Sequence, residues 1–275
     1  MEIGKHFANL ASYNQNMALS LQDKLFFLEH LPHETGYLFV DFGCADGTLI
    51  DALYHMLPKG NKYLGFDISE TMIDLARTKM TSSPKNVKFT ADWEDVQRIL
   101  TNNPNEKKVL ILSSVVHEVY SYGMSDDIEK FWKRVLYTGF DYICVRDMMV
   151  PSSTYGEHTP NEWLNNIRWD AHNCVPSSRH EQFILKWGSL EIKRNALHYL
   201  LKYRWQINWE REVRENYFPV SIEDFLDQFV GEYNLDYFQR FRIPFLDECI
   251  KKDFGIEFGD NDSTHIKVVF SKKTY

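Results

Sequence analysis

The sequence is short of the features that mark secreted, membrane and metal-binding proteins. Its 4 cysteines lie far apart and none belongs to a Cys-x-x-Cys pair, which indicates intracellular thiols rather than a disulfide framework or a zinc site. No apolar run approaches the roughly 18 residues of a membrane span, and residues 1–15 contain no apolar signal core. We therefore expect a cytoplasmic protein with no bound metal and no membrane partner.

Positive charge is also in deficit. Lys and Arg number 31 against 39 Asp and Glu, and the net charge of −8 argues against a nucleic-acid surface over the whole molecule. One segment departs from this balance: residues 179–214 hold eight Lys or Arg against four Glu, interleaved with aromatic residues. That pattern is typical of single-stranded nucleic-acid binding. The same apolar spacing also suits helices that pack on a core with their charges outside.

An apolar content of 44%, with 15% aromatic residues, is ample for a packed core. The clearest local pattern lies in residues 37–80, which read as a buried strand (37–41), a tight turn (43–47), a helix, a second strand (63–67) and a second helix. In such units a nucleotide-type ligand lies across the carboxyl ends of parallel strands, with an acid after the second strand to bind ribose hydroxyls. Asp67 follows Gly43 by 24 residues, near the roughly 20-residue offset expected of that acid.

The turn itself separates two cofactor classes. A dinucleotide-binding turn has the pattern G-x-G-x-x-G, but Leu49 and Ile50 occupy the region of its third glycine. The stretch D-F-G-C-A-D-G resembles the D/E-x-G-x-G-x-G signature of class I S-adenosylmethionine-dependent methyltransferases, with an alanine in place of the middle glycine. The resemblance implies a floor under the methionine part of the cofactor made by Asp41, Gly43, Ala45 and Gly47. It also implies that Asp67 binds the ribose and that Ile68 packs on the adenine.

The resemblance further implies an α/β fold: a doubly wound, mostly parallel seven-stranded sheet with an antiparallel last strand. The remaining strands are predicted at residues 86–90, 107–114, 141–145, 233–243 and 265–271. We expect the methyltransferase core to comprise residues 36–151 and 220–275. Residues 152–219 are predicted to form a mainly helical insertion that caps the acceptor site. Residues 1–35 are predicted to form a helical segment that closes on the cofactor, with Tyr13 lining the pocket.

Two strand ends supply the other expected cofactor contacts. After the third predicted strand, the resemblance implies a hydrogen bond from the adenine amino group to Asp92 and a stacking contact with Trp93. Asp92 also suits the N-cap of the following helix, and one residue can serve both roles. At the end of the fourth predicted strand, Ser113 is expected at the cofactor.

The segment that follows Ser113, S-V-V-H-E-V-Y, contains the candidate catalytic residues. Methyl transfer is an in-line displacement at a sulfonium carbon, so an enzyme supplies mainly proximity and orientation. A hydroxyl acceptor must also lose a proton, and the resemblance to small-molecule methyltransferases places His117 as the base. Glu118 is a second candidate, either as the base or as the residue that orients His117. Asp147, at the end of the fifth predicted strand, is expected to point toward the acceptor.

Three functions follow from these observations. The first is transfer of a methyl group from S-adenosylmethionine to oxygen or nitrogen of a small molecule. The second is methylation of RNA or DNA, with residues 179–214 as the binding surface; against it, residues 113–116 read S-S-V-V instead of an N-P-P-Y-like tetrapeptide. The third is a non-catalytic module that binds S-adenosylmethionine. Binding of NAD, in place of S-adenosylmethionine, would revive a nicotinamide enzyme.

Overall fold

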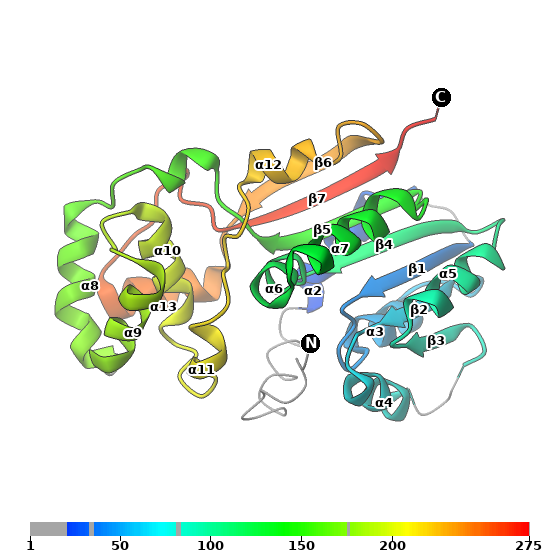
Figure 1. Ribbon diagram of the computed structural model, residues 1–275, viewed down its shortest axis with the longest axis horizontal. Helices are drawn as coiled ribbons and strands as arrows, with labels where there is room; N and C mark the ends of the chain where they lie inside the picture. The colour runs from blue at the N-terminus through cyan, green and yellow to red at the C-terminus, as the bar shows by residue number, and fades with distance from the viewer. Residues whose placement is uncertain (1–20, 33–35, 81–83, 175–176, 275) are drawn as a thin grey trace. The chain divides into compact units, whose positions relative to one another are not determined.

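The computed structural model describes residues 21–32, 36–80, 84–174 and 177–274. Its sheet has seven strands in the order β3-β2-β1-β4-β5-β7-β6 (Figure 1). The strands are β1 (Tyr37–Phe42), β2 (Lys62–Phe66), β3 (Val87–Thr90), β4 (Lys107–Ser113), β5 (Tyr142–Met148), β6 (Tyr233–Phe241) and β7 (His265–Lys272). Strands β3, β2, β1, β4 and β5 pair in parallel.

The last strand runs against its neighbours. Between β7 and β5, Lys272 N donates to Asp141 O and Met149 N donates to Thr264 O. Residue numbers therefore rise along one strand where they fall along the other, which makes the pair antiparallel. The pairs Thr264–Phe241 and Lys273–Glu232 show the same relation between β7 and β6. The predicted fold class, a mostly parallel seven-stranded sheet with an antiparallel last strand, is confirmed.

Helices cover both faces of the strands that carry the expected cofactor turn. They are α2 (Leu21–Lys24), η2 (Phe26–Glu29), α3 (Thr48–Met56), α4 (Glu70–Lys79), α5 (Trp93–Thr101), α6 (Val116–Tyr122) and α7 (Ser125–Tyr137). Strand β1 is buried along its whole length, as expected of a central parallel strand. On one face Phe39 packs on Phe27 of η2, and on the other Phe42 packs on Trp93 of α5 and Phe131 of α7.

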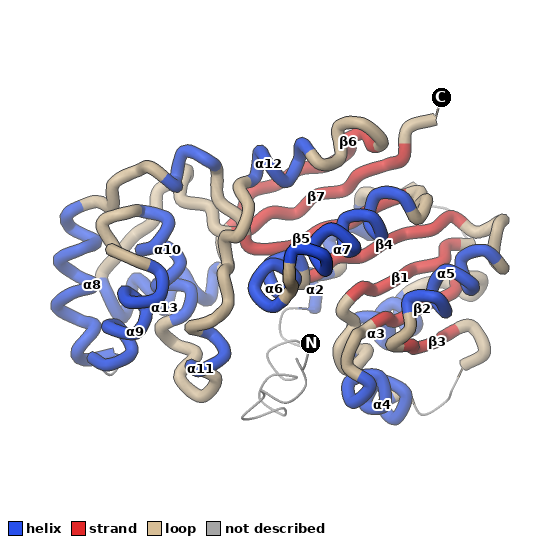
Figure 2. The backbone as a smooth tube through the Cα atoms, viewed as in Figure 1, coloured by secondary structure: helices blue, strands red, loops and turns tan. Residues whose placement is uncertain are grey.

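The chain divides into two compact units. Unit 1 comprises residues 1–147, 229–238 and 267–275, and unit 2 comprises residues 148–228 and 239–266. The helices of unit 2 are η3 (Ser152–Tyr155), α8 (Asn161–Cys174), α9 (Ser177–Trp187), α10 (Lys193–Lys202), α11 (Trp209–Glu212), α12 (Ile222–Asp227) and α13 (Pro244–Phe254). Figure 2 shows how completely helices and loops make up this part of the chain.

Unit 2 is larger than the insertion expected at residues 152–219. It has its own apolar core, and Ile250 and Phe254 of α13 lie in that core with Tyr199 and Leu200 of α10. The connection between β6 and β7 therefore packs with helices from a segment about fifty residues earlier in the chain. That residues 152–219 cap the acceptor site stays a prediction.

Further expectations from the sequence concern Tyr13, membrane-spanning helices, a metal site and the location of the protein. Tyr13 lies outside the described residues, so its place at the cofactor stays a prediction. Among the helices in the described ranges, none has the length and apolar character that crossing a bilayer requires. The described residues also hold no group of three His, Cys, Asp or Glu side chains arranged to bind a metal ion. The cytoplasmic location stays a prediction.

Candidate functional site

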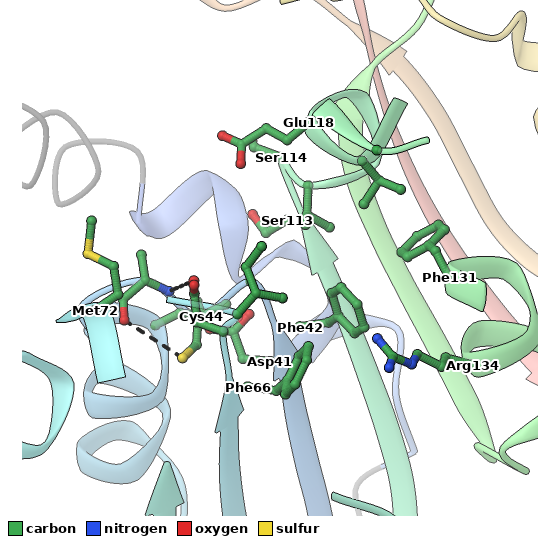
Figure 3. Close-up of a pocket in the computed structure, with 18 of the residues that line it drawn as sticks. Asp41, Phe42, Cys44, Phe66, Met72, Ser113, Ser114, Glu118, Phe131 and Arg134 are labelled. Atoms are coloured by element: carbon green, nitrogen blue, oxygen red, sulfur yellow. Dashed lines mark hydrogen bonds between the residues drawn. The ribbon is translucent and has the colours of Figure 1, made fainter. Parts of the chain in front are cut away.

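A cavity of about 410 Å³ lies in unit 1 at the carboxyl ends of β1, β2 and β4 (Figure 3). Six residues predicted for the cofactor line it: Asp41, Gly43, Ala45, Asp67, Ile68 and, at the end of β4, Ser113. Glu118 of α6, a candidate base, lines it as well. The structure thus brings together residues from three strand ends, as the βα pattern of the sequence predicts.

The turn after β1 is held in left-handed backbone geometry. Gly43, Ala45 and Gly47 have φ of +80°, +46° and +75°. A side chain at Gly43 would meet Val115 Cγ2 at 2.8 Å, and one at Gly47 would meet the Phe89 ring at 2.9 Å. Gly47 therefore serves the packing of the turn, and its position is not among those that line the cavity. Ala45 adopts a conformation that side chains disfavour, so its neighbours must hold it there.

Asp67 holds Ala45 in this backbone conformation through a hydrogen bond. The amide of Ala45 donates to Asp67 Oδ2 at 3.0 Å, and the amide of Ser69 donates to Oδ1 at 2.9 Å. Burial raises the pKa of Asp67, although both amide hydrogen bonds oppose the rise. The carboxylate predicted to bind the ribose therefore also ties the first turn to the second strand.

A buried pair of opposite charges faces the cavity beside this turn. Asp41 of β1 is 3% exposed and Lys24 of α2 is 8% exposed, and both line the cavity. Burial raises the pKa of Asp41 to about 7, opposed by the charge of Lys24. Burial lowers the pKa of Lys24 to about 8, while Asp41, Asp46 and Glu118 favour its charged form. Lys24 sits in a short polar helix turn, and no local pattern in the sequence identifies it as a site residue.

The end of β4 carries a second left-handed residue, Ser114, with φ of +58°. Its amide donates to Arg146 O at 2.7 Å, and Arg146 Nη1 donates to its hydroxyl at 3.2 Å. Arg146 in turn lies 2.5 Å from Asp23, the residue before Lys24. The neighbouring hydroxyl of Ser113 is buried and has no hydrogen-bond partner among the described residues. An unpaired polar atom that lines a cavity indicates a polar ligand there.

His117 follows this turn at the start of α6. Its Nδ1 lies 2.6 Å from Asp147 Oδ1, and the amide of Val116 donates to Asp147 Oδ2 at 2.7 Å. His117 is 4% exposed and Asp147 is fully buried. The sequence places both residues near the acceptor and offers Glu118 either as the base or as the residue that orients His117; in the structure the His117 ring contacts Asp147. The ring of His117 is not among the groups that line the cavity, whereas Glu118 is.

Asp92 and Trp93 lie at the end of β3 but are not among the lining residues. Asp92 caps α5, because its Oδ1 accepts a hydrogen bond from Glu94 N at 2.9 Å. Trp93 is buried, with its ring centroid 5.3 Å from that of Phe66 and 5.0 Å from Cζ of Arg134. Their expected contacts with adenine stay predictions.

The side of the cavity next to Trp93 is aromatic and cationic. Phe42, Phe66, Phe131 and Arg134 line it, and Figure 3 shows them together, away from Cys44 and Met72. Burial lowers the pKa of Arg134, while Asp127 and Asp92 favour its charged form. Arg134 is not among the site residues that the sequence predicts. This lining was not predicted from the sequence; the aromatic residues at the ends of β1 and β2 are the signal that could have indicated it, since alternate residues of a buried strand face the same side.

Part of unit 1 matches a known protein family. Residues 39–136 match a family profile described as a methyltransferase domain. A comparison with the curated proteins finds no match. Among solved structures, a chain of the Haloferax volcanii complex that contains the Trm112 methyltransferase activator has a TM-score of 0.51 and 13% identity. That alignment covers 100% of this chain and 99% of the other, and the likeness shows the fold.

Two further solved structures are similar at lower TM-scores. The plantazolicin methyltransferase BamL, in complex with a desmethyl analogue and S-adenosylhomocysteine, has a TM-score of 0.47 and 10% identity over 95% of this chain and 87% of its own. The pyocyanin biosynthetic protein PhzM has a TM-score of 0.48 and 14% identity over 96% of this chain and 60% of its own.

Proposed function

We propose that this chain, in which residues 39–136 match a methyltransferase-domain profile, is a class I S-adenosylmethionine-dependent methyltransferase that transfers the methyl group to oxygen or nitrogen of a small-molecule acceptor. The observation that carries the proposal is the buried contact between His117 and Asp147; the residue after His117, Glu118, lines the cavity. Methyl transfer to a neutral acceptor requires a group that takes a proton, and a histidine held by a carboxylate can take it.

The residues around the cavity fit the cofactor. Asp41 and Lys24 offer opposite charges for a zwitterionic amino acid, and Ser113 offers an unpaired hydroxyl. Asp67 lies at the end of β2, where a ribose binds in folds of this kind. Bound S-adenosylmethionine supplies an electrophilic methyl group, whose sulfonium becomes the neutral thioether of S-adenosylhomocysteine when the methyl leaves.

The chain's own contribution is orientation and proton transfer. An ionised carboxylate only accepts hydrogen bonds, so Nδ1 of His117 carries the proton shared with Asp147. We assign to His117 the removal of the proton that leaves the acceptor. Glu118 lines the cavity and is the second candidate for this role.

The nucleic-acid alternative draws no support from residues 179–214. Phe183, Tyr199, Tyr203 and Trp209 are each at most 3% exposed and belong to the apolar core of unit 2. Their rings are therefore not available to stack on bases. Several cations of the segment are paired inside unit 2, among them Arg211 with Glu215 and Lys193 with Glu157 and Asp262.

Calorimetric titration with S-adenosylmethionine and S-adenosylhomocysteine, with NAD as the control, tests the cofactor. We expect binding of the two sulfur compounds alone. A screen of small-molecule acceptors, monitored by release of S-adenosylhomocysteine, then tests the acceptor class. Turnover with RNA fragments and with no small molecule would replace the proposed acceptor, and tight cofactor binding without turnover on either pool would favour a non-catalytic module.

A further inference from the structure

Four residues of α7 line the cavity at helical spacing. They are Asp127, Lys130, Phe131 and Arg134, whose separations of three and four residues place them on one face of the helix. The preceding helix, α6, lines the cavity with the candidate base Glu118. The residues predicted for the cofactor come instead from the ends of β1, β2 and β4. Helices α6 and α7 therefore form a side of the cavity to which the sequence assigns no cofactor contact.

Arg134 lies half-buried among aromatic rings on this side. Its Cζ is 5.0 Å from the ring centroid of Trp93 and 6.0 Å from that of Phe66. Figure 3 shows its guanidinium directed from α7 toward Phe42 and Phe66. A ring contact of this kind stabilises the charge but supplies no lone pair to the five N–H donors of a guanidinium. Within the described ranges these donors form no hydrogen bond and no ion pair.

Lys130 lies one helical turn before Arg134 and is a second cation at the cavity. It is exposed, and in the part of the chain that the structure describes it forms no ion pair either. The acid on the same helix face, Asp127, accepts a hydrogen bond of 3.1 Å from the Met124 amide at the start of α7. Burial lowers the pKa of Arg134, and Asp127 and Asp92 favour its charged form. An anion that enters the cavity would favour that form further.

We propose that Lys130 and Arg134 bind an anionic group of the methyl acceptor, a carboxylate or a phosphate attached to an aromatic ring. The inference rests on the proposed function, because it takes the ligand on the α7 side of the cavity to be the acceptor. Both anions match the fork of N–H donors that a guanidinium presents. Phe42, Phe66 and Phe131 line the cavity beside Arg134, where an aromatic ring of the acceptor would pack.

Three probes that share one ring test the preference for an anion. Benzoate and phenyl phosphate are anions at neutral pH, whereas benzamide is neutral and has nearly the shape of benzoate. In the presence of S-adenosylhomocysteine, we expect the wild type to bind at least one of the two anions about tenfold more tightly than benzamide, since charge-assisted hydrogen bonds are the strong ones. The tighter of the two anions shows whether the site prefers a carboxylate or a phosphate.

Arg134→Met should remove this preference. We expect the variant to bind the preferred anion about tenfold more weakly and benzamide within twofold of the wild type, whereas Arg134→Lys keeps the charge and should keep part of the preference. Lys130→Met should weaken the anion less, because Lys130 is exposed. Lys133→Met is the matched control, since Lys133 belongs to the same helix, pairs with Glu129 and is not among the lining residues. Ligand-detected NMR measures the dissociation constants, and thermal melts check that each variant is folded.

Three results would overturn the inference. One is a wild type that binds benzamide as tightly as the anions, or that binds none of the three probes. Another is an Arg134→Met variant that loses benzamide as strongly as the anion, which would make Arg134 a packing residue. The third is competition between the anion and S-adenosylhomocysteine, which would assign the two cations to the cofactor. Failure of the proposed function is distinguishable, because S-adenosylhomocysteine itself would then not bind, and titration of the probes without it still measures the preference for an anion.

Discussion

The amide of Ala45 donates a hydrogen bond of 3.0 Å to Oδ2 of Asp67, and so joins the turn after β1 to the turn after β2. Ala45 needs this bond because its φ of +46° is unfavourable for a residue with a side chain. Ser69 N holds the other oxygen at 2.9 Å. One carboxylate therefore fixes the shape of the cavity floor in addition to its predicted contact with ribose.

Asp67→Ala should consequently lose both cofactor affinity and stability. Loss of a charged hydrogen-bond partner weakens binding by about 1.5–3 kcal/mol, and each partly buried amide left unpaired costs about 1–3 kcal/mol. Asp67→Asn, which keeps one carbonyl oxygen as an acceptor, should lose less stability. Calorimetry and thermal melts measure the two effects. A variant that binds S-adenosylhomocysteine normally would show that the ribose site lies elsewhere.

Gly43→Ala should be more damaging than Gly60→Ala, although the backbone disfavours a side chain at both positions. Gly43 and Gly60 both have positive φ, +80° and +114°, but a Cβ at Gly43 would meet Val115 Cγ2 at 2.8 Å while one at Gly60 meets nothing within 4 Å. We expect Gly60→Ala to lose about 1–2 kcal/mol from backbone strain alone. Gly43→Ala should lose more and also bind the cofactor poorly. Equal losses for the two variants would mean that the turn adjusts around the added methyl.

How far the sequence predicts this structure depends on the range of the interaction. The apolar spacing of residues 125–137 predicts an amphipathic helix capped by Ser125; the helix is observed as Ser125–Tyr137, but its N-cap is Met124 and Ser125 is its first residue. The parallel strands and the acid at the end of β2 follow from the βα pattern in the same way. The sequence predicts two roles for Asp92, an N-cap and a contact with adenine. The structure shows the N-cap, which is the role that depends on local sequence alone.

The contacts that sequence reasoning missed join distant residues. His117 and Asp147 are 30 residues apart, and only the pairing of β4 with β5 brings them together. Lys24 belongs to a short helix whose orientation is set by tertiary packing, so nothing local singles it out among 31 basic residues. The place of α13 in the core of unit 2 depends likewise on contacts with α8 and α10, which no periodicity within α13 reports.

His117→Ala should lower turnover while leaving cofactor affinity nearly unchanged. General base catalysis contributes about 10²- to 10⁴-fold, so we expect a loss of kcat in that range. Asp147→Asn should lower kcat through His117, because the ring loses the carboxylate that orients it. Steady-state kinetics with the identified acceptor, beside calorimetry with S-adenosylhomocysteine, separates the two quantities.

Glu118→Gln is the companion variant for that prediction, since Glu118 lines the cavity and is the alternative base. Full activity of His117→Ala together with a strong loss in Glu118→Gln would transfer the role of base to Glu118. Thermal melts of all three variants are needed as well, because removal of His117 leaves the buried Asp147 without one of its partners.

Asp41→Asn should stabilise the ligand-free protein in a pH-dependent way. Burial raises the pKa of Asp41 from 3.8 to about 7, so between these pH values the folded chain binds more protons than the unfolded chain. Stability from this group is therefore present at low pH and is lost as pH rises toward 7. Asparagine removes the loss, and we expect the gain in Tm to be larger at pH 8 than at pH 5. Asp74→Asn, an exposed surface change, should give no such difference. An equal gain at both pH values would show that ionisation of Asp41 does not destabilise the folded protein. Weaker binding of S-adenosylhomocysteine by the stabilised variant would show that the destabilising carboxylate also serves cofactor recognition.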